Sequence, residues 1–112
     1  MDAEFDYICT ASADGHQVKV VGEVDIATAP QLAEALAQFA TSTVRVDITG
    51  VTFLDSSGLH ALYAAHRYIS RNGGRMIICG ELDPRIKRVM DMTELTEVFE
   101  FDPQHVDPRP FA

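Results

Sequence analysis

Three neighbouring polar residues, Asp55, Ser56 and Ser57, occupy the point of the chain where residue type and spacing suggest chemistry. An alternating apolar run precedes them, and apolar residues at helical spacing follow. Asp and Ser are preferred N-cap residues, because a side-chain oxygen accepts a hydrogen bond from a free N–H of the first helical turn. We therefore expect a strand-to-helix junction with a serine hydroxyl at the mouth of the fold, where open α/β sheets place functional groups. The alternative interpretation is a helix cap with no further role.

The chain before this junction is expected to form a hairpin and a helix. Residues 5–10 and 17–22 are apolar enough for two strands, and Asp14-Gly15 is a turn signal between them. The pair is predicted to be antiparallel, because a parallel return needs a dozen or more connecting residues. Residues 27–40 follow as a helix, with Thr28 as its N-cap and a proline in its first turn.

The segment 43–49 alternates strictly between apolar and polar residues. That period is typical of a strand with one buried and one solvated face. The apolar set is Val44, Val46 and Ile48, and the polar set is Arg45, Asp47 and Thr49. Helices are therefore expected to cover mainly one side of the sheet. A right-handed crossover through the preceding helix makes this strand parallel to the second strand.

The remaining elements follow from local signals. The junction helix is expected to run to about Arg71, where Asn72-Gly73-Gly74 supplies a left-handed C-cap. Further along, the sequence predicts an apolar strand at 76–79, a helix opening at Asp83-Pro84 and an edge strand at 97–101. Residues 102–112 contain three prolines and are not expected to be a regular helix throughout. The fold class is thus α/β, with a mixed four- to five-stranded sheet in a single domain spanning residues 1–112.

Composition excludes several classes of function. The chain has 112 residues and a net charge of −8, so it is expected to bind neither nucleic acid nor an anionic membrane surface directly. It shows no signal segment and no membrane-length apolar run, and a cytoplasmic location is expected. The two cysteines lack the spacing of a zinc site, and neither a metal nor another cofactor is expected.

Motifs of the common enzyme classes are missing as well. The sequence has no Walker A motif and no Gly-x-Gly-x-x-Gly after a strand. A Gly-x-Ser-x-Gly elbow is also absent, because Asp55 stands two residues before Ser57. We therefore expect a protein that is not itself an enzyme.

Four segments together resemble the STAS family, specifically the bacterial anti-sigma factor antagonists. The central one is 46–59, which ends in Phe-Leu-Asp-Ser-Ser-Gly-Leu; the others are 21–30, 72–80 and 86–93. They occur in the order and spacing of that family. The resemblance implies the STAS fold, with the helices packed mainly on one face of the sheet.

The same resemblance implies a regulatory cycle. Ser56 matches the phosphorylated serine of the family, and Ser57, the second choice, matches the Ser or Thr beside it. The implied partners are an anti-sigma factor that is also a serine kinase with a histidine-kinase-like ATPase fold, and a phosphatase of the PP2C type. The unphosphorylated form would bind the anti-sigma factor and free the sigma factor. The implied contact residues are Asp25, Thr28, Asp55, Ser57, Gly58, Leu59 and His60.

Two of these positions carry open alternatives. Asp25 is either a contact residue beside Ser56 or a solvated loop carboxylate or cap. His60 stands where many relatives carry glycine, and we expect it to influence partner choice. An alternative for the whole chain keeps the fold without phosphorylation: a STAS scaffold, or an accessory subunit of a signalling or lipid-transport complex.

Overall fold

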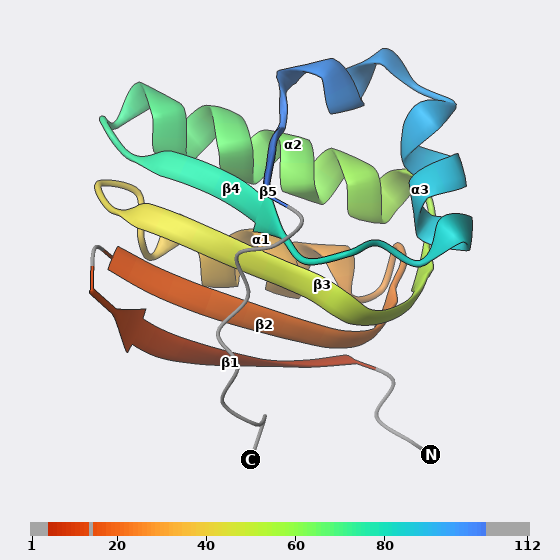
Figure 1. The fold of residues 1–112 in the computed structure, drawn as a ribbon, viewed down its shortest axis with the longest axis horizontal. Helices are drawn as coiled ribbons and strands as arrows, with labels where there is room; N and C mark the ends of the chain where they lie inside the picture. Colours follow the sequence, from red (N-terminus) through yellow and green to blue (C-terminus); the bar gives the residue numbers. More distant parts are fainter. Residues whose placement is uncertain (1–4, 14, 103–112) are drawn as a thin grey trace.

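The computed structural model describes residues 5–13 and 15–102, which form one five-stranded sheet with its helices (Figure 1). The strand order across the sheet, β1-β2-β3-β4-β5, is the order in the sequence. The elements are β1 (Phe5–Ser12), β2 (Gly15–Val24), α1 (Ala29–Ala37), β3 (Thr43–Leu54), α2 (Ser56–Arg71), β4 (Arg75–Cys79), α3 (Pro84–Asp91), the 3₁₀ helix η1 (Glu94–Val98) and β5 (Glu100–Asp102).

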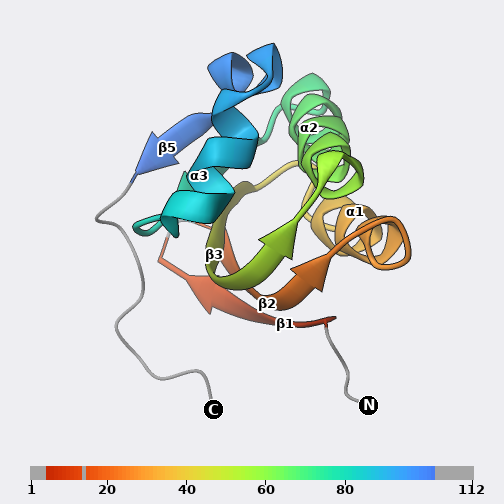
Figure 2. The same cartoon turned by 90° about the vertical axis from the view of Figure 1, so that its right-hand side faces the viewer.

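The sheet is mixed, as the sequence predicts. β1 and β2 form an antiparallel hairpin, whereas β2–β3, β3–β4 and β4–β5 are parallel pairs. Helices α1 and α2 lie side by side on one face of the sheet (Figure 2). The expected fold class, an α/β fold with its helices mainly on one side, is therefore confirmed. Asp14, which the sequence places in the hairpin turn, and the proline-rich segment 103–112 lie outside the described residues.

Strand β3 is longer than the predicted segment 43–49 and extends to Leu54, just before α2 begins. Its first residues, Thr43 to Asp47, pair with β4, while its pairing with β2 continues to the couple Val24–Leu54. The last part of β3 therefore extends beyond β4 with only β2 as its sheet neighbour. This extension delivers the ends of β2 and β3 to the same edge of the sheet.

The core lies between the sheet and helices α1 and α2. Valines of β2 and β3 meet leucines of the two helices, as their spacing predicts. Members that are at most 1% exposed include Val18, Val20, Val44, Val46, Leu32, Leu36, Leu59 and Leu62. Burial of these side chains at about 1.5–3 kcal/mol each is the main force that holds the helices on the sheet.

The prediction of a solvated polar face on β3 is wrong at Asp47, which is fully buried. Its Oδ1 atom accepts hydrogen bonds from the Thr49 N–H at 2.9 Å and the Thr49 hydroxyl at 2.6 Å. Two donors on one oxygen reduce the cost of removing the carboxylate from water. Alternation of apolar and polar residues indicates on which face of a strand a residue lies, but not whether that face is exposed to solvent.

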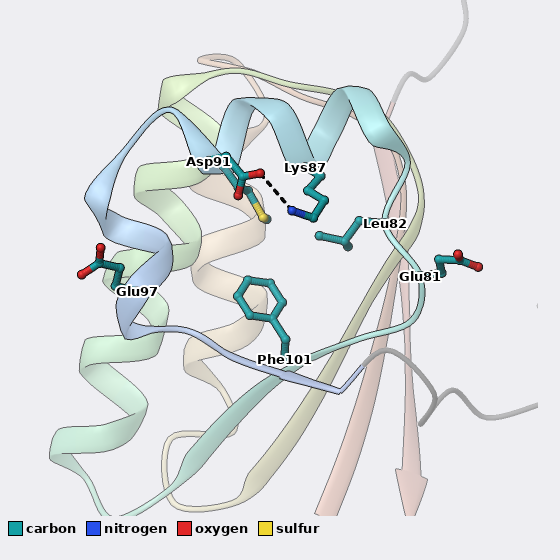
Figure 3. Close-up of a pocket in the computed structure, with 7 residues that line it drawn as sticks. Glu81, Leu82, Lys87, Asp91, Glu97 and Phe101 are labelled. Atoms are coloured by element: carbon teal, nitrogen blue, oxygen red, sulfur yellow. Dashed lines mark hydrogen bonds and ion pairs between the residues drawn. The ribbon is translucent and has the colours of Figure 1, made fainter.

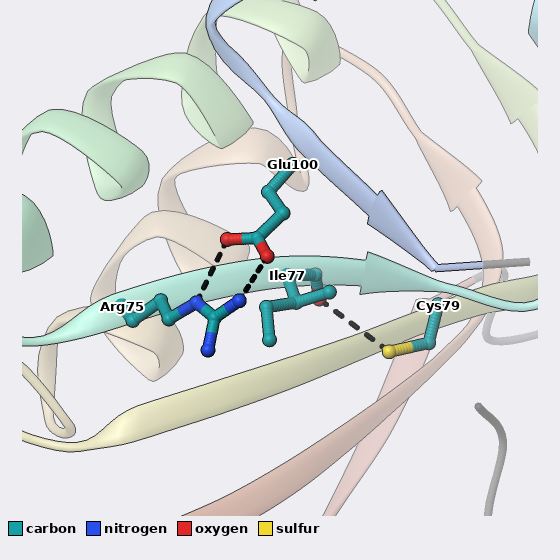
Figure 4. A network of polar contacts seen from close by, with 4 residues as sticks. All are labelled: Arg75, Ile77, Cys79 and Glu100. Atoms are coloured by element: carbon teal, nitrogen blue, oxygen red, sulfur yellow. Dashed lines mark hydrogen bonds and ion pairs between the residues drawn. The ribbon is translucent and has the colours of Figure 1, made fainter.

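The last strand is shorter than predicted. Glu97 and Val98 belong to η1, and β5 begins only at Glu100. A cross-strand ion pair joins β5 to β4: the Arg75 guanidinium donates its Nε–H to Glu100 at 2.8 Å and a second N–H to the other carboxylate oxygen (Figure 4). On the same strand, the buried Cys79 thiol lies 3.7 Å from the Ile77 carbonyl oxygen.

Helix α2 ends as the sequence predicts. Gly73 adopts a φ of +88°, a conformation that side chains disfavour. The Gly74 N–H then donates to the Ile69 carbonyl at 2.9 Å, and the Gly73 N–H donates to Ser70 at 3.2 Å. These two bonds form a Schellman cap, which stops the helix and turns the chain into β4.

Candidate functional site

The junction of β3 and α2 presents Ser56 to solvent. Asp55 is the N-cap of α2, and its carboxylate accepts a hydrogen bond from the Gly58 N–H at 3.0 Å. Ser56 is the first residue of the helix and is exposed, while Ser57 is half-buried. Within the described part of the chain, this leaves the first-turn N–H groups of Ser56 and Ser57 without an acceptor. The predicted strand-to-helix junction is thus present, with a serine hydroxyl in reach of another macromolecule.

The loop between β2 and α1 is tied together by Asp25 and Thr28. The Asp25 carboxylate accepts from the Ala27 N–H at 2.9 Å and from the Thr28 N–H at 3.1 Å. The Thr28 hydroxyl donates to the Glu23 carbonyl at 2.8 Å and accepts from the Asp25 N–H at 3.0 Å. These bonds hold the loop rigidly against the end of β2.

Thr28 is the N-cap residue of the first helix, as the sequence predicts, but its side chain makes no capping hydrogen bond. The Thr28 hydroxyl donates to the Glu23 carbonyl of β2, and the Asp25 carboxylate accepts hydrogen bonds from the loop N–H groups instead. The helix consequently begins at Ala29 rather than at residue 27.

Parallel pairing of β2 and β3 brings Asp25 and Asp55 to one edge. The register places Val24 beside Leu54, and the Asp55 N–H donates to the Val24 carbonyl at 3.4 Å. The next residue on each strand is an aspartate. Each carboxylate accepts a hydrogen bond from a backbone N–H group of its own segment. The two aspartates therefore fix the backbone at this edge in addition to placing negative charge there.

Gly58 allows α2 to approach this edge closely. A Cβ atom at this position would lie 2.7 Å from the Val24 carbonyl oxygen and 2.6 Å from the Leu54 Cδ1 atom. Real Cβ atoms do not sit that close to other heavy atoms. The glycine therefore sets how near Ser56 lies to the Asp25 loop.

The other predicted contact residues fall into two groups. Gly58 and Leu59 are buried, and the Leu59 side chain has no exposure at all. They hold α2 in place and offer no side-chain surface to a partner. His60, in contrast, is exposed one helical turn after Ser56, and its Nδ1 atom lies 2.8 Å from the Ser56 carbonyl oxygen.

Sequence reasoning missed two apolar residues at this edge. Ile26 is 78% exposed in the Asp25 loop, and Phe53 is 47% exposed near the end of β3. Ile26 directly follows Asp25, and Phe53 stands two residues before Asp55, so both lie on the segments that carry the predicted contact residues. No signal in the sequence separates them from core residues, because both belong to patterns that otherwise predict burial.

The residues that the structure describes form neither a metal-ligand cluster nor a membrane-spanning helix. Across residues 5–13 and 15–102, no group of three or more His, Cys, Asp or Glu side chains is arranged to hold a metal ion. Within the same ranges, none of the helices combines the length and the apolar character needed to cross a bilayer.

Comparison with known proteins assigns the class. The STAS domain family model matches residues 7–107, and the chain belongs to this family. An anti-sigma-B factor antagonist of Staphylococcus epidermidis is 34% identical over 88 residues, which cover 76% of this chain and 81% of the relative. One of Listeria monocytogenes is 30% identical over 90 residues, or 78% of each chain. The crystal structure of an anti-sigma factor antagonist from Mycobacterium paratuberculosis has a TM-score of 0.77 at 25% identity, covering 89% of this chain and 86% of that one.

Proposed function

We propose that this protein is an anti-sigma factor antagonist whose docking is switched by phosphorylation of Ser56. The relatives' names support the antagonist role. The observation that carries the proposal is the exposed Ser56 hydroxyl on the first turn of α2, beside the ordered Asp25 loop. The unphosphorylated form binds an anti-sigma factor at this edge, and the sigma factor is thereby released.

The partner surface combines polar and apolar groups. Exposed Ser56 and His60 and the half-buried Asp25 form its polar part, and Ile26 and Phe53 supply apolar contact. Because this chain carries a net charge of −8, a partner with basic or mixed charge fits it best. Buried Gly58 and Leu59 contribute by fixing the position of α2.

The chemistry belongs to the partners. The anti-sigma factor, acting as a serine kinase with a histidine-kinase-like ATPase fold, transfers the γ-phosphoryl group of ATP to the Ser56 oxygen, and ADP and the hydroxyl proton leave. A PP2C-type phosphatase hydrolyses the phosphoserine with water, which restores the hydroxyl and releases phosphate. This chain supplies an accessible nucleophile at a fixed position.

Phosphorylation is expected to leave the fold nearly unchanged. The phosphate adds about −1.5 to −2 charges. The free N–H groups and the dipole of α2 favour an anion here by roughly 0.3–1 kcal/mol, and the neighbouring Asp55 carboxylate opposes it by a similar amount. The two effects nearly cancel within the monomer.

Phosphorylation is expected to have a larger effect on the interface with the anti-sigma factor. A 100-fold loss of affinity corresponds to about 2.7 kcal/mol. Burying an unpaired charge in a protein interface costs about 3–5 kcal/mol. Charge and bulk at Ser56 are therefore sufficient to release the partner, and no conformational relay through the fold is needed.

Phosphate transfer is tested by mass spectrometry with the cognate anti-sigma kinase and ATP. Wild type and Ser57→Ala should each gain one phosphate, and Ser56→Ala should gain none. Binding of Ser56→Glu to the same partner should be at least about ten-fold weaker than that of wild type. Full phosphorylation of Ser56→Ala would show that the site is wrong. Unchanged binding of Ser56→Glu would refute the charge switch.

A further inference from the structure

A cavity lies between α3, η1 and β5 (Figure 3). Its volume is about 490 Å³, which is within the usual range of small-molecule sites of roughly 300–1,000 Å³. Seven residues line it: Glu81, Leu82, Lys87, Met90, Asp91, Glu97 and Phe101. The proposed function uses none of them.

The walls of this cavity are apolar. Leu82 and the ring of Phe101 face a common space in Figure 3, and the aliphatic stem of Lys87 joins them. The buried Met90 also lines the cavity. Phe101 remains 41% exposed, although Phe99, two residues earlier, is buried. An aromatic ring left open in a concave, apolar site is the feature expected of a binding pocket.

The charges around the opening are predominantly negative. Lys87 is neutralised by Asp91, whose carboxylate lies 2.9 Å from the Lys87 ammonium. Glu81 and Glu97 are exposed on opposite sides of the opening, and their carboxylates point outward into solvent (Figure 3). Among the described residues that line the cavity, three carboxylates against one ammonium leave a net negative field, which favours a cation and disfavours an anion at the mouth.

We propose that this cavity binds a small molecule with an apolar body and a cationic amine. The apolar body occupies the space between Leu82, Met90 and Phe101, and the amine remains at the rim near Glu81 or Glu97. A fatty acid or another anionic amphiphile fits the apolar walls equally well, but it meets the wrong sign of charge at the opening. The inference is independent of the role proposed for Ser56.

The pocket lies at the same end of the sheet as the candidate docking edge. Glu81 and Leu82 follow the carboxyl end of β4, just as Asp25 and Asp55 follow the ends of β2 and β3. Figure 1 shows α3 at the end of the molecule where α2 begins. This is the edge of parallel strands where α/β folds place ligands.

Three probes of matched shape test the proposal: 4-phenylbutylamine, 4-phenylbutanol and 4-phenylbutanoate. Each is titrated into the full chain while backbone amide NMR shifts are followed. We take the Glu81 and Glu97 carboxylates to be roughly 7 Å from the bound amine. Coulomb attraction then predicts that 4-phenylbutylamine binds about five-fold more tightly than 4-phenylbutanol at low salt and about two-fold more tightly near physiological salt. The carboxylate should bind most weakly. The shifts should concentrate in residues 81–101.

Charge variants separate the two parts of the proposal. The double variant Glu81→Gln with Glu97→Gln should bind the amine no better than the alcohol, with alcohol binding unchanged. Glu34→Gln, the same change on an exposed residue of α1, should behave as wild type. Leu82→Gln should weaken all three probes.

Three results would overturn the proposal. The first is that no probe saturates, and the second is that the amine shows no advantage over the alcohol in wild type. The third is that the shifts map outside residues 81–101. A thermal melt of each variant confirms that it is folded before its binding is compared.

Discussion

Replacing Gly58 by alanine sets two known effects against each other. Alanine favours a helix over glycine by about 1 kcal/mol, so a surface glycine in α2 would be improved by this change. Gly58, however, is buried against β2 and β3. The new Cβ atom would meet the Leu54 Cδ1 atom at 2.6 Å, the Val24 oxygen at 2.7 Å and the Val24 Cγ1 atom at 2.8 Å.

The steric effect should dominate. The two side-chain carbons can rotate away, but the Val24 oxygen belongs to the backbone of β2 and accepts the Asp55 N–H. Moving it lengthens a bond that is already 3.4 Å. Overpacking of this kind costs about 1–3 kcal/mol. Because the gain in helix propensity is smaller in the first turn than in the interior, we expect a net loss of about 1–2 kcal/mol, or roughly 5–10 °C in Tm.

Urea unfolding followed by circular dichroism measures this loss. The matched control is Ala64→Gly, at an exposed position of the same helix, which should lose about 1 kcal/mol through propensity alone. If Gly58→Ala is as stable as wild type or more stable, while Ala64→Gly shows its loss, the close approach of α2 to β2 is not tight. The account of how Gly58 positions Ser56 would then fail.

Other measurements test the cap, the thiols and the β4–β5 ion pair. Asp55→Ala should lose about 1 kcal/mol in urea unfolding and Asp55→Asn much less, because the Gly58 N–H keeps its acceptor; equal losses would contradict the cap. In a thiol-reagent assay of the native protein, exposed Cys9 should react rapidly, whereas Cys79, whose pKa burial raises to about 11, should react only on unfolding; two rapid thiols would contradict this. The hydrogen bond from Arg75 lowers the pKa of the Glu100 carboxyl, so the pair stabilises above the normal carboxyl range and loses that effect as pH falls through the lowered pKa. The stability difference between wild type and Glu100→Gln should therefore be within about 1 kcal/mol near neutral pH and vanish at acid pH; a difference that grows on acidification would refute the assignment.

Features encoded within a few residues were predictable from the sequence. Asp55 caps α2, and Asp83 caps α3 by accepting from the Arg85 N–H at 2.8 Å. Gly73 ends α2 in the left-handed conformation. Each depends on residue types and backbone groups within about one helical turn or slightly more, so local spacing identifies it. The STAS family assignment was likewise predictable, since its motifs are local segments.

Features that depend on distant backbone were not predictable. The Thr28 hydroxyl binds Glu23, five residues earlier, because the loop folds back on β2. Asp47 is buried in a central strand, where it pairs with Lys19 of β2 and Cys79 of β4, and alternation does not report those neighbours. The 3₁₀ helix replaced the start of a predicted strand because 97–101 has an apolar pattern compatible with either.

The candidate site divides in the same way. The serine at the start of α2 follows from its cap, but the exposure of Phe53 depends on the packing of β3 beside β2, and Ile26 is exposed in the loop after β2. Register places Glu23 opposite Phe53, and so it decides which apolar side chains at the sheet edge remain open. Nothing in a single sequence fixes that register.

The sheet order has a consequence for biosynthesis. Every strand pairs only with the strands next to it in the chain, and no later segment inserts between earlier ones. A polypeptide emerging from the ribosome can thus add each strand to the growing edge as it is made. Both aspartates of the docking edge, and the whole of α2, precede β4. The proposed docking edge therefore consists entirely of residues translated before the last two strands.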